Sequence, residues 1–213
     1  DYLAQTVAHV EERMQAPGNL WGIPTGFADL DKILHGLQRG TTVSVSGNPS
    51  VGKSKLAFQI GLNAAKAGYR TTLYSLEMSS RVTVLRLLSA EAHIPTEHME
   101  SGFLPDAWHQ KMLDAAGVLS SIPLALCFDT ALTTAALRAD AAKRKGMEGL
   151  DLVVVDYFGR LKDTAENANE RDKEMSRALH DTALELDVAL LCVDTFNKAG
   201  MASGEKSVEH LSG

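Results

Sequence analysis

The chain has 213 residues, about one and a half times a typical domain of ~150 residues, so we expect one α/β domain with an appendage. Hydrophobic residues make up 45%, charged residues 23% and aromatic residues 6%, which is typical of a globular protein and excludes a disordered or collagen-like chain. The formal net charge of −6 has the wrong sign for a monomer that binds nucleic acid through a broad basic face. Any contact with DNA must therefore be local or arise from the assembly of several copies.

No part of the sequence is typical of a membrane span or a secretion signal. The longest stretch without a formal charge, residues 115–128, is 14 residues long and contains polar residues, whereas a span needs about 20 apolar ones. The chain opens without a basic or apolar leader, so we expect a cytoplasmic protein. Cys127 and Cys192 lie in apolar runs without a second ligand at metal-binding spacing, which predicts buried core thiols.

The first predicted element is a helix within residues 1–16. Its apolar residues are spaced three and four apart and form one stripe, Leu3, Val7, Val10 and Met14. A Pro-Gly pair at residues 17–18 ends the pattern. Such a helix can pack on its own domain or dock on a neighbouring subunit, and the sequence leaves both possibilities open.

From residue 42 onward, short β-rich runs alternate with helical patterns, which predicts βαβ units and a mostly parallel sheet. The predicted strands are residues 42–46, 71–76, 124–128, 152–156 and 188–193. Residues 152–155 are apolar throughout, as expected for a strand covered by helices on both faces. Helical periodicity ends at Gly68 after the first strand and runs from Met175 to Leu186 before the last.

The strongest motif directly follows the first predicted strand and opens the next helix. It has the pattern G-x-x-x-x-G-K-[ST] and consists of Gly47, Asn48, Pro49, Ser50, Val51, Gly52, Lys53 and Ser54. Its glycines let backbone N–H groups surround phosphate oxygens, and the helix N-terminus adds its positive dipole end. In such a loop Lys53 contacts the β- and γ-phosphates and the Ser54 hydroxyl ligates Mg²⁺. We therefore expect ATP and Mg²⁺ to bind here.

Two carboxylates follow predicted strands. Asp156 ends the apolar strand at the sheet edge where open α/β folds bind ligands, which suits a Walker B aspartate that holds Mg²⁺ through water. Glu77 ends another strand and is suited to orient and deprotonate the attacking water, provided that it lies one water away from the γ-phosphate. A helix-capping role for Glu77, together with Ser79 and Ser80, is an open alternative.

The P-loop, residues 22–31 (GIPTGFADLD), 36–40 (GLQRG), 75–79 (SLEMS) and 155–157 (VDY) together resemble the C-terminal motor of DnaB-type replicative helicases. The resemblance covers about Trp21 to Val193 and implies a RecA-like α/β fold, with helices on both faces of a mostly parallel central sheet. It implies a hexameric ring that hydrolyses nucleotide at subunit interfaces and translocates on single-stranded DNA, with a primase or helicase loader as possible partners.

The resemblance also implies roles for individual residues and segments. Glu77 corresponds to the catalytic glutamate of the family, and Lys53 acts beside it on the phosphates. Residues 1–16 correspond to the linker helix that docks on the adjacent subunit, and residues 17–213 to a RecA-like ATPase domain that is truncated at its C-terminus. Because only the linker segment stands before Trp21, we expect no N-terminal helical domain of the DnaB type.

Three features depart from the family pattern. In residues 194–198 (DTFNK), Thr195 replaces the glutamine that senses the γ-phosphate, and loop 162–171 is acidic on balance, unlike a DNA channel lining. The chain stops at Gly213, before the strands that carry the in-trans arginine, and its last arginine is Arg177. We therefore expect the 213 residues alone to be a monomer or loose oligomer with slow ATP turnover and little stimulation by single-stranded DNA.

A second class of function stays open, a RecA-like ATP-binding module that regulates or assembles other proteins with weak or no strand separation. Thr195 and the acidic loop favour this module, whereas the P-loop, Glu77 and Asp156 favour the motor. Arg86 is interpreted as the partner of a neighbouring acid, and the seven histidines show no ligand spacing. The one basic cluster is interpreted as cations at a helix end rather than a DNA patch, and comprises Arg138, Lys143, Arg144 and Lys145.

Overall fold

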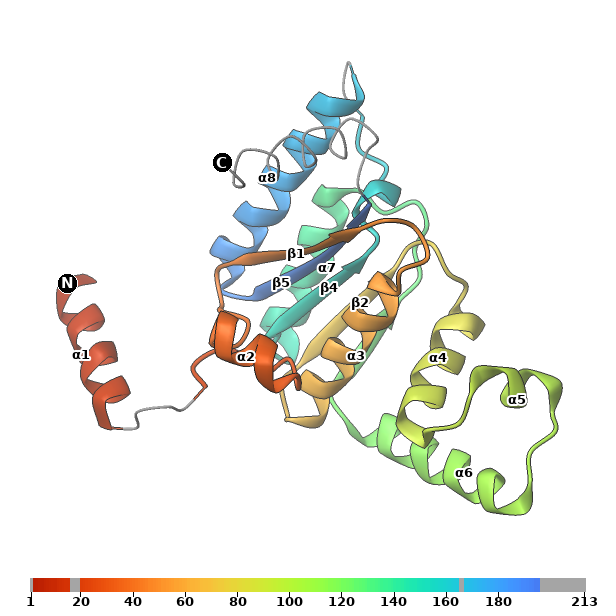
Figure 1. The fold of residues 1–213 in the computed structure, drawn as a ribbon. Helices are drawn as coiled ribbons and strands as arrows, with labels where there is room; N and C mark the ends of the chain where they lie inside the picture. The colour runs from red at the N-terminus through yellow and green to blue at the C-terminus, as the bar shows by residue number, and fades with distance from the viewer. Residues whose placement is uncertain (1, 16–19, 165–166, 196–213) are drawn as a thin grey trace, which may run out of the picture.

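The computed structural model describes residues 2–15, 20–164 and 167–195 (Figure 1). In chain order the elements are α1 (Tyr2–Gln15), α2 (Ala28–Leu34), β1 (Thr42–Gly47), α3 (Lys53–Lys66), β2 (Thr71–Ser75), α4 (Ser80–Ala92), α5 (Thr96–Ser101), α6 (Asp106–Ser121), β3 (Leu124–Cys127), α7 (Thr134–Met147), β4 (Leu152–Asp156), the 3-10 turn η1 (Phe158–Arg160), α8 (Ala168–Leu186) and β5 (Ala189–Thr195).

The five strands form one parallel sheet in the order β1-β5-β4-β2-β3. This confirms the predicted α/β class and all five predicted strands, whose bounds differ from the expected ones by at most two residues. The β4 bounds agree at both ends. All carboxyl ends of these strands meet at one edge of the sheet, which we call the carboxyl edge, and the opposite one is the amino edge.

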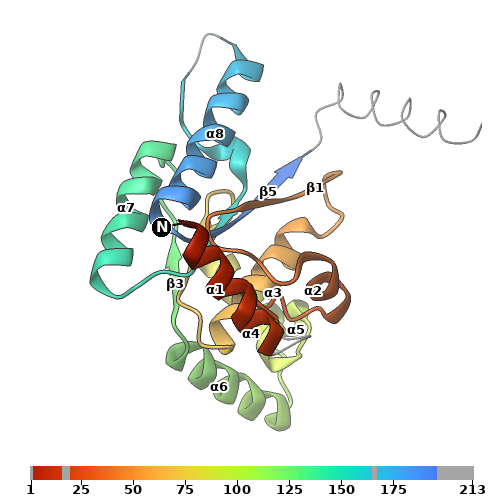
Figure 2. The same ribbon diagram turned by 90° about the vertical axis from the view of Figure 1, so that its left-hand side faces the viewer.

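Helices cover both faces of the sheet, with α3 on one face and α7 and α8 on the other (Figure 2). Each face has its own hydrophobic core, and residues of β4 contribute to both, Val154 on the α3 face and Val155 on the α7 and α8 face. Every residue of β4 is buried, which explains its continuous apolar sequence. The predicted helical face of α8 is likewise packed, with Met175 and Leu179 buried.

The two cysteines differ in burial. Cys192, on the interior strand β5, is buried, and this burial raises the pKa of its thiol to about 12. The prediction of a core thiol is therefore confirmed for Cys192. For Cys127 it is wrong in part, because β3 is the edge strand of the sheet and leaves that side chain only half-buried.

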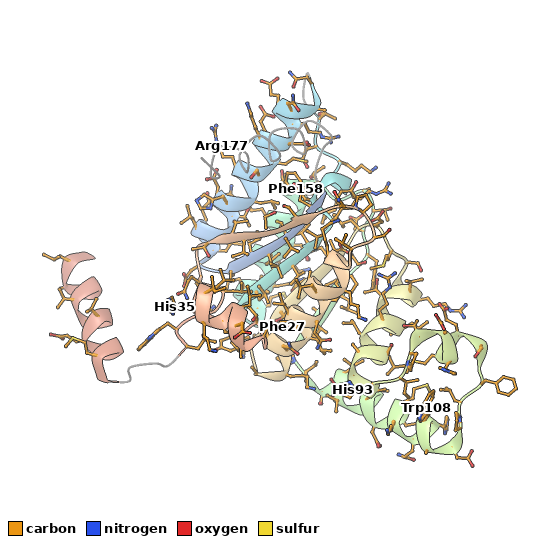
Figure 3. The ribbon with its side chains drawn as sticks, viewed as in Figure 1. Phe27, His35, His93, Trp108, Phe158 and Arg177 are labelled. Atoms are coloured by element: carbon orange, nitrogen blue, oxygen red, sulfur yellow. The ribbon has the colours of Figure 1, made fainter. Side chains whose placement is uncertain are left out.

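Helices α4, α5 and α6 form a separate layer between β2 and β3 in the chain, on the outer side of α3 (Figure 1). They share a small hydrophobic core around Ile94 and Ala115. Trp108 packs against this core and meets the His98 ring edge-on, with the ring centroids 4.9 Å apart (Figure 3).

The first helix, α1, has the predicted apolar stripe, and this stripe is not buried. Its side chains are 47% to 74% exposed at Leu3, Val7, Val10 and Met14. Figure 1 shows α1 at a distance from the two-faced core of the sheet. The structure therefore gives no support to packing on the chain's own domain.

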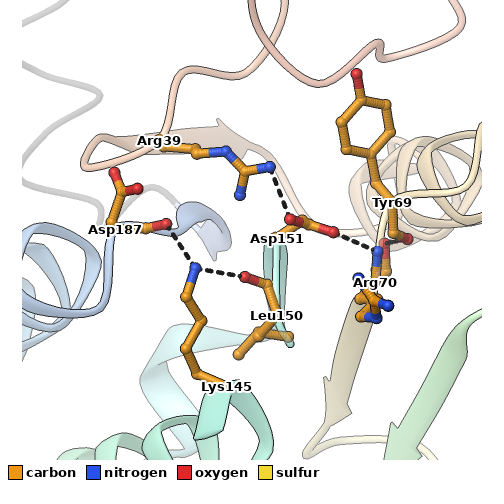
Figure 4. A network of polar contacts seen from close by, with 8 residues as sticks. Arg39, Tyr69, Arg70, Lys145, Leu150, Asp151 and Asp187 are labelled. Atoms are coloured by element: carbon orange, nitrogen blue, oxygen red, sulfur yellow. Dashed lines mark hydrogen bonds and ion pairs between the residues drawn. The ribbon is translucent and has the colours of Figure 1, made fainter. Parts of the chain in front are cut away.

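A network of polar contacts links the chain segments at the amino edge of the sheet (Figure 4). The Asp151 carboxylate accepts from the Arg39 guanidinium and from the Arg70 backbone N–H, both at 2.7 Å. The Lys145 ammonium donates to the carbonyl oxygens of Leu150 and Asp187 at 3.0 and 3.2 Å. Because these residues lie close before β1, β2, β4 and β5, the network joins the amino ends of four strands.

Most of the predicted basic cluster is engaged within the domain. The Arg144 guanidinium donates to the Asp140 carboxylate at 2.7 Å, and Arg138 pairs with Glu185. Together with the bonds of Lys145, these contacts favour the structural interpretation of the cluster over a DNA patch. None of the described helices is long and apolar enough to cross a membrane.

Candidate nucleotide-binding site

The P-loop lies at the carboxyl edge, between the end of β1 and the start of α3. The loop turns sharply, with left-handed φ angles of 65° at Ser50 and 96° at Gly52. A φ of 96° strongly favours glycine, which explains why the sequence has a glycine directly before the lysine. The turn directs the first backbone N–H groups of α3 into the cleft beside the loop.

Lys53 folds back over its own loop. Its ammonium donates to the carbonyl oxygens of Gly47 and Asn48 at 2.9 and 2.8 Å. The charge of Lys53 is therefore held at the concave side of the P-loop, where the pattern predicted contact with phosphates.

Ser54 and Asp156, which are 102 positions apart in the sequence, meet at the carboxyl edge. The Ser54 hydroxyl donates to Asp156 Oδ1 at 2.8 Å. Asp156 is fully buried, and its Oδ2 has no hydrogen-bond partner within the described part of the chain. Burial raises the pKa of Asp156, and the charge of Glu77 adds to the rise, while the Ser54 hydrogen bond and the charges of Arg86 and Lys53 oppose it.

A buried carboxylate with a free oxygen beside a hydroxyl fits a hard divalent cation such as Mg²⁺, which prefers oxygen ligands and retains several waters. Within the described ranges no group of three or more His, Cys, Asp or Glu residues is suited to hold a metal ion. The pair Ser54 and Asp156 therefore fits a cation that takes its other ligands from phosphates and water, rather than an all-protein metal cage.

Glu77 lies beside Asp156 because the two chain segments are hydrogen-bonded. The Leu76 N–H donates to the Asp156 carbonyl oxygen at 2.7 Å, which extends the pairing of β2 with β4 past the last strand residue. The Glu77 side chain is 47% exposed, and its Oε1 lies 3.5 Å from the Arg160 guanidinium. The helix-capping alternative does not apply to Glu77, because Ser79 is the N-cap of α4 and accepts from the Val82 N–H.

Lys53, Ser54 and Glu77 line one cleft with a volume of about 1840 Å³, and the buried Asp156 lies behind its wall, bonded to Ser54. Its walls include the P-loop from Pro49 to Ser54, Glu77 and Tyr157 from the ends of β2 and β4, and Arg86 from α4. Arg86 forms no direct ion pair among the described residues, but its charge acts on the neighbouring Asp156 and opposes the rise of its pKa, so the predicted pairing with an acid is met only at longer range. A smaller hollow of about 310 Å³ between β1, β5 and α8 contains no residue of the P-loop.

The segment 22–31 anchors the helix that carries the P-loop. The Asp31 carboxylate accepts from the backbone N–H and the hydroxyl of Thr25, both at 2.8 Å. The Asn63 amide, from α3, donates to the Thr25 carbonyl oxygen at 2.8 Å. The sequence motif indicated that this segment matters, but no pattern along the chain could identify Asn63 as its partner.

The structure describes part of each of the features that depart from the family pattern. The backbone of Thr195 pairs in register with Gly47, so this position lies beside the start of the P-loop, while residues 196–198 lie outside the described part of the chain. In the acidic loop, Asp163 accepts from the N–H and hydroxyl of Thr134 at the start of α7. Arg177 is exposed on α8, which covers the sheet face opposite α3 (Figure 3).

Comparison with known proteins agrees with this architecture. The sequence matches the DnaB-like helicase C-terminal domain over residues 22–207. It is 32% identical to the replicative DNA helicase DnaB of Geobacillus stearothermophilus over 204 residues and to the replicative DNA helicase DnaC of Bacillus subtilis over 205. Each alignment covers 93% of this chain but only 45% and 44% of the relative, so the chain spans about half the length of these proteins.

Two solved structures share the fold. The ATPase domain of G40P superposes with a TM-score of 0.86 at 24% identity, covering 93% of this chain and 72% of that one. A DnaB-like replicative helicase, studied together with its interactions with primase, superposes with a TM-score of 0.83 at 23% identity, covering 91% and 48%. These similarities identify a RecA-like ATPase fold, and by its sequence the chain belongs to the DnaB-like helicase C-terminal domain family.

Proposed function

We propose that this chain is the ATP-hydrolysing motor domain of a DnaB-like hexameric replicative helicase that translocates on single-stranded DNA. The observation that carries the proposal is the contact of Ser54 with Asp156, because it joins the P-loop to a buried strand-end carboxylate at the carboxyl edge. Residues 47–54 are proposed to bind ATP, Ser54 and Asp156 to hold Mg²⁺, and Lys53 and Glu77 to act in catalysis.

In this proposal the P-loop binds the phosphates of ATP through its backbone N–H groups and the N-terminus of α3. Lys53 exchanges its two carbonyl acceptors for phosphate oxygens and keeps its charge at the β- and γ-phosphates. Bound Mg²⁺ supplies charge neutralisation on the same phosphates. Asp156 and Ser54 would hold the metal, Asp156 through water, and that water would give a partner to the Asp156 oxygen that has none among the described residues.

Glu77 is proposed to orient the attacking water and accept its proton. Its carboxylate lies at the wall of the same cleft as Lys53 and Ser54, on a strand adjacent to the one that ends in Asp156. Phosphoryl transfer depends mainly on positioning and charge stabilisation. The wall of the cleft that holds Glu77 therefore also determines how well the attacking water is aligned.

The proposal includes partners. Self-association into a ring accounts for the exposed stripe of α1, which would bury its apolar side chains on an adjacent copy. The names of the relatives support DNA as the substrate, and we propose single-stranded DNA as the form that is bound. The primase interactions of one similar structure support primase as a partner, and a helicase loader is a further proposed partner. A cytoplasmic location stays a prediction.

The alternative, an ATP-binding regulatory or assembly module, has one observation in its favour. Residues at the start of the acidic loop serve the fold itself, because Asp163 is bonded to α7 and the Lys162 N–H to the Leu132 carbonyl oxygen. Stimulation of ATP hydrolysis by single-stranded DNA separates the two functions, since a motor is stimulated and a module is not.

The phosphate-binding role is tested by Lys53→Ala and calorimetric titration with ATP and Mg²⁺. Loss of a charged donor predicts about tenfold to hundredfold weaker binding. Lys32→Ala is the matched control, because Lys32 is an exposed lysine on α2 that does not line the cleft. Unchanged ATP affinity in Lys53→Ala would contradict the assignment of the P-loop.

A further inference from the structure

We infer that Arg160 is a positioning residue that restrains the Glu77 carboxylate through Oε1, so that release of this arginine frees both carboxylate oxygens for the attacking water. The inference rests on the proposed function, because it assumes that Glu77 is the general base. Arg160 was not among the residues indicated by any sequence motif.

The backbone fixes both partners on adjacent segments. Arg160 ends the turn η1 directly after β4, and its N–H donates to the Tyr157 carbonyl oxygen at 3.0 Å. Glu77 follows Leu76, whose N–H is bonded to the Asp156 carbonyl oxygen at 2.7 Å. The two side chains therefore extend from neighbouring strand ends, and Arg160 Nη2 lies 3.5 Å from Glu77 Oε1.

The ring of Tyr157 contacts the Arg160 guanidinium and restricts its position. Arg160 Cζ lies 5.9 Å from the centre of this ring, within the range of a cation–π contact. The ring itself packs against Gly159, where an added Cβ would come within 2.6 Å of Tyr157 Cε2. A larger residue at position 159 would displace the ring, so the glycine is needed for this stack, and Tyr157 also lines the cleft.

The contact engages one of the two carboxylate oxygens that can accept the proton. A carboxylate accepts a proton from water through its lone pairs, and those of Oε1 face the guanidinium. The separation of 3.5 Å is longer than a tight charge-assisted hydrogen bond, and the two side chains are 47% and 50% exposed. An ion pair of this kind is weak and readily released, as required of a restraint that opens in each catalytic cycle.

The test is a double-mutant cycle measured as single-turnover and steady-state ATP hydrolysis. Arg160→Ala should raise kcat by about two- to fivefold, the range set by an exposed ion pair, and leave the KM for ATP unchanged. Arg160→Lys, which keeps a cation, should return kcat toward that of the unmodified chain. In a Glu77→Gln background, Arg160→Ala should have no effect, because a neutral amide does not form the ion pair.

The control is Arg138→Ala, which breaks a pair of equal exposure, with side chains 52% and 47% exposed, between α7 and α8. It should not change kcat. An unchanged or lower kcat in Arg160→Ala, or an equal increase in the Glu77→Gln background, would overturn the inference. If Glu77→Gln itself hydrolyses ATP as fast as the unmodified chain, the assignment of the general base is wrong, which is a different failure.

Discussion

The two edges of the central sheet differ in how far the chain satisfies its own polar groups. At the amino edge, Asp151 and Lys145 each contact two partners, and the network joins four strands. At the carboxyl edge, Asp156 retains one buried oxygen without a partner in the described chain, and Glu77 has a single long contact. The charged groups of the first edge are bonded, and its one buried polar atom without a partner in the described chain is the neutral hydroxyl oxygen of Thr42, whereas the second edge has a carboxylate oxygen to offer to a ligand.

This difference indicates a division of stability and function between the edges. An unpaired buried polar group costs free energy of folding. An edge that retains such a group therefore lowers the stability of the fold and leaves the group available to bind a ligand. At the amino edge the Asp151 carboxylate and the Lys145 ammonium are bonded, and the unpaired group is only the hydroxyl of Thr42, which carries no charge. Substitutions at the two edges should therefore affect different measurements.

The largest expected effect is that of Glu77→Gln at the carboxyl edge. Loss of a general base should slow single-turnover hydrolysis by about 10²–10⁴-fold, while ATP affinity and thermal stability stay nearly unchanged. Glu185→Gln, which alters an exposed partner of Arg138, is the matched control and should leave hydrolysis unaffected. A small effect of Glu77→Gln on hydrolysis would contradict the assignment of catalysis to the carboxyl edge.

At the amino edge, Asp151→Ala should lower the free energy of unfolding by about 1–3 kcal/mol, because the Arg70 N–H and the Arg39 guanidinium lose their acceptor. ATP affinity should not change. Denaturant unfolding and calorimetric titration of the same variant measure both quantities. Asp29→Ala, which breaks an ion pair whose aspartate side chain is 94% exposed, is the control and should cost less than about 0.5 kcal/mol.

A smaller effect with a distinctive pH dependence is expected for Asp156→Asn. Because the pKa of Asp156 is raised in the folded state, ionisation of this carboxylate destabilises the ligand-free fold, and stability returns as the pH falls through the raised pKa. Asp156→Asn should therefore unfold at a higher temperature than the unmodified chain at pH 7, and this gain should vanish below the usual aspartate range. Binding of ATP should lose much of its dependence on Mg²⁺.

Asp140 is the control for this prediction, because its pKa is shifted in the opposite direction to that of Asp156. Burial by itself would raise the pKa of Asp140, but hydrogen bonds from Arg144 and Tyr74 outweigh burial and lower this pKa. Its stabilising contribution is present above the unfolded pKa and is lost as the pH falls through the folded value, so Asp140→Asn should destabilise the chain at pH 7. If both variants shifted the unfolding temperature in the same direction at pH 7, the contrast between the two carboxylates would be contradicted.

The sequence was sufficient to predict what depends on local patterns. Alternation of β-rich and helical runs predicted five strands, and strand-end positions predicted that Asp156 would lie at the same edge as the P-loop. The half-burial of Cys127 was missed because strand order is set by packing across the whole domain, and the chain pattern does not reveal that β3 is an edge strand.

Contacts between distant residues could not be predicted for a related reason. Arg160 lies 83 positions from Glu77, and neither residue has a periodic or motif signal that points to the other. The same holds for Asp151 with Arg39 and for Asn63 with Thr25. Each pair depends on which strands become neighbours, so its members are identified only once the sheet is formed.

The bonds from the Lys53 ammonium to the Gly47 and Asn48 carbonyl oxygens would make the proposed phosphate binding an exchange reaction. The ammonium has three N–H donors, so an incoming anion can use the third at once but gains the other two only after the existing acceptors have been released, and the net affinity is a difference between two sets of bonds. A monovalent anion such as chloride replaces these acceptors poorly, whereas a polyphosphate with several oxygens replaces them fully. The resting loop thus selects against the abundant small anions of a cell and in favour of a chelating polyanion.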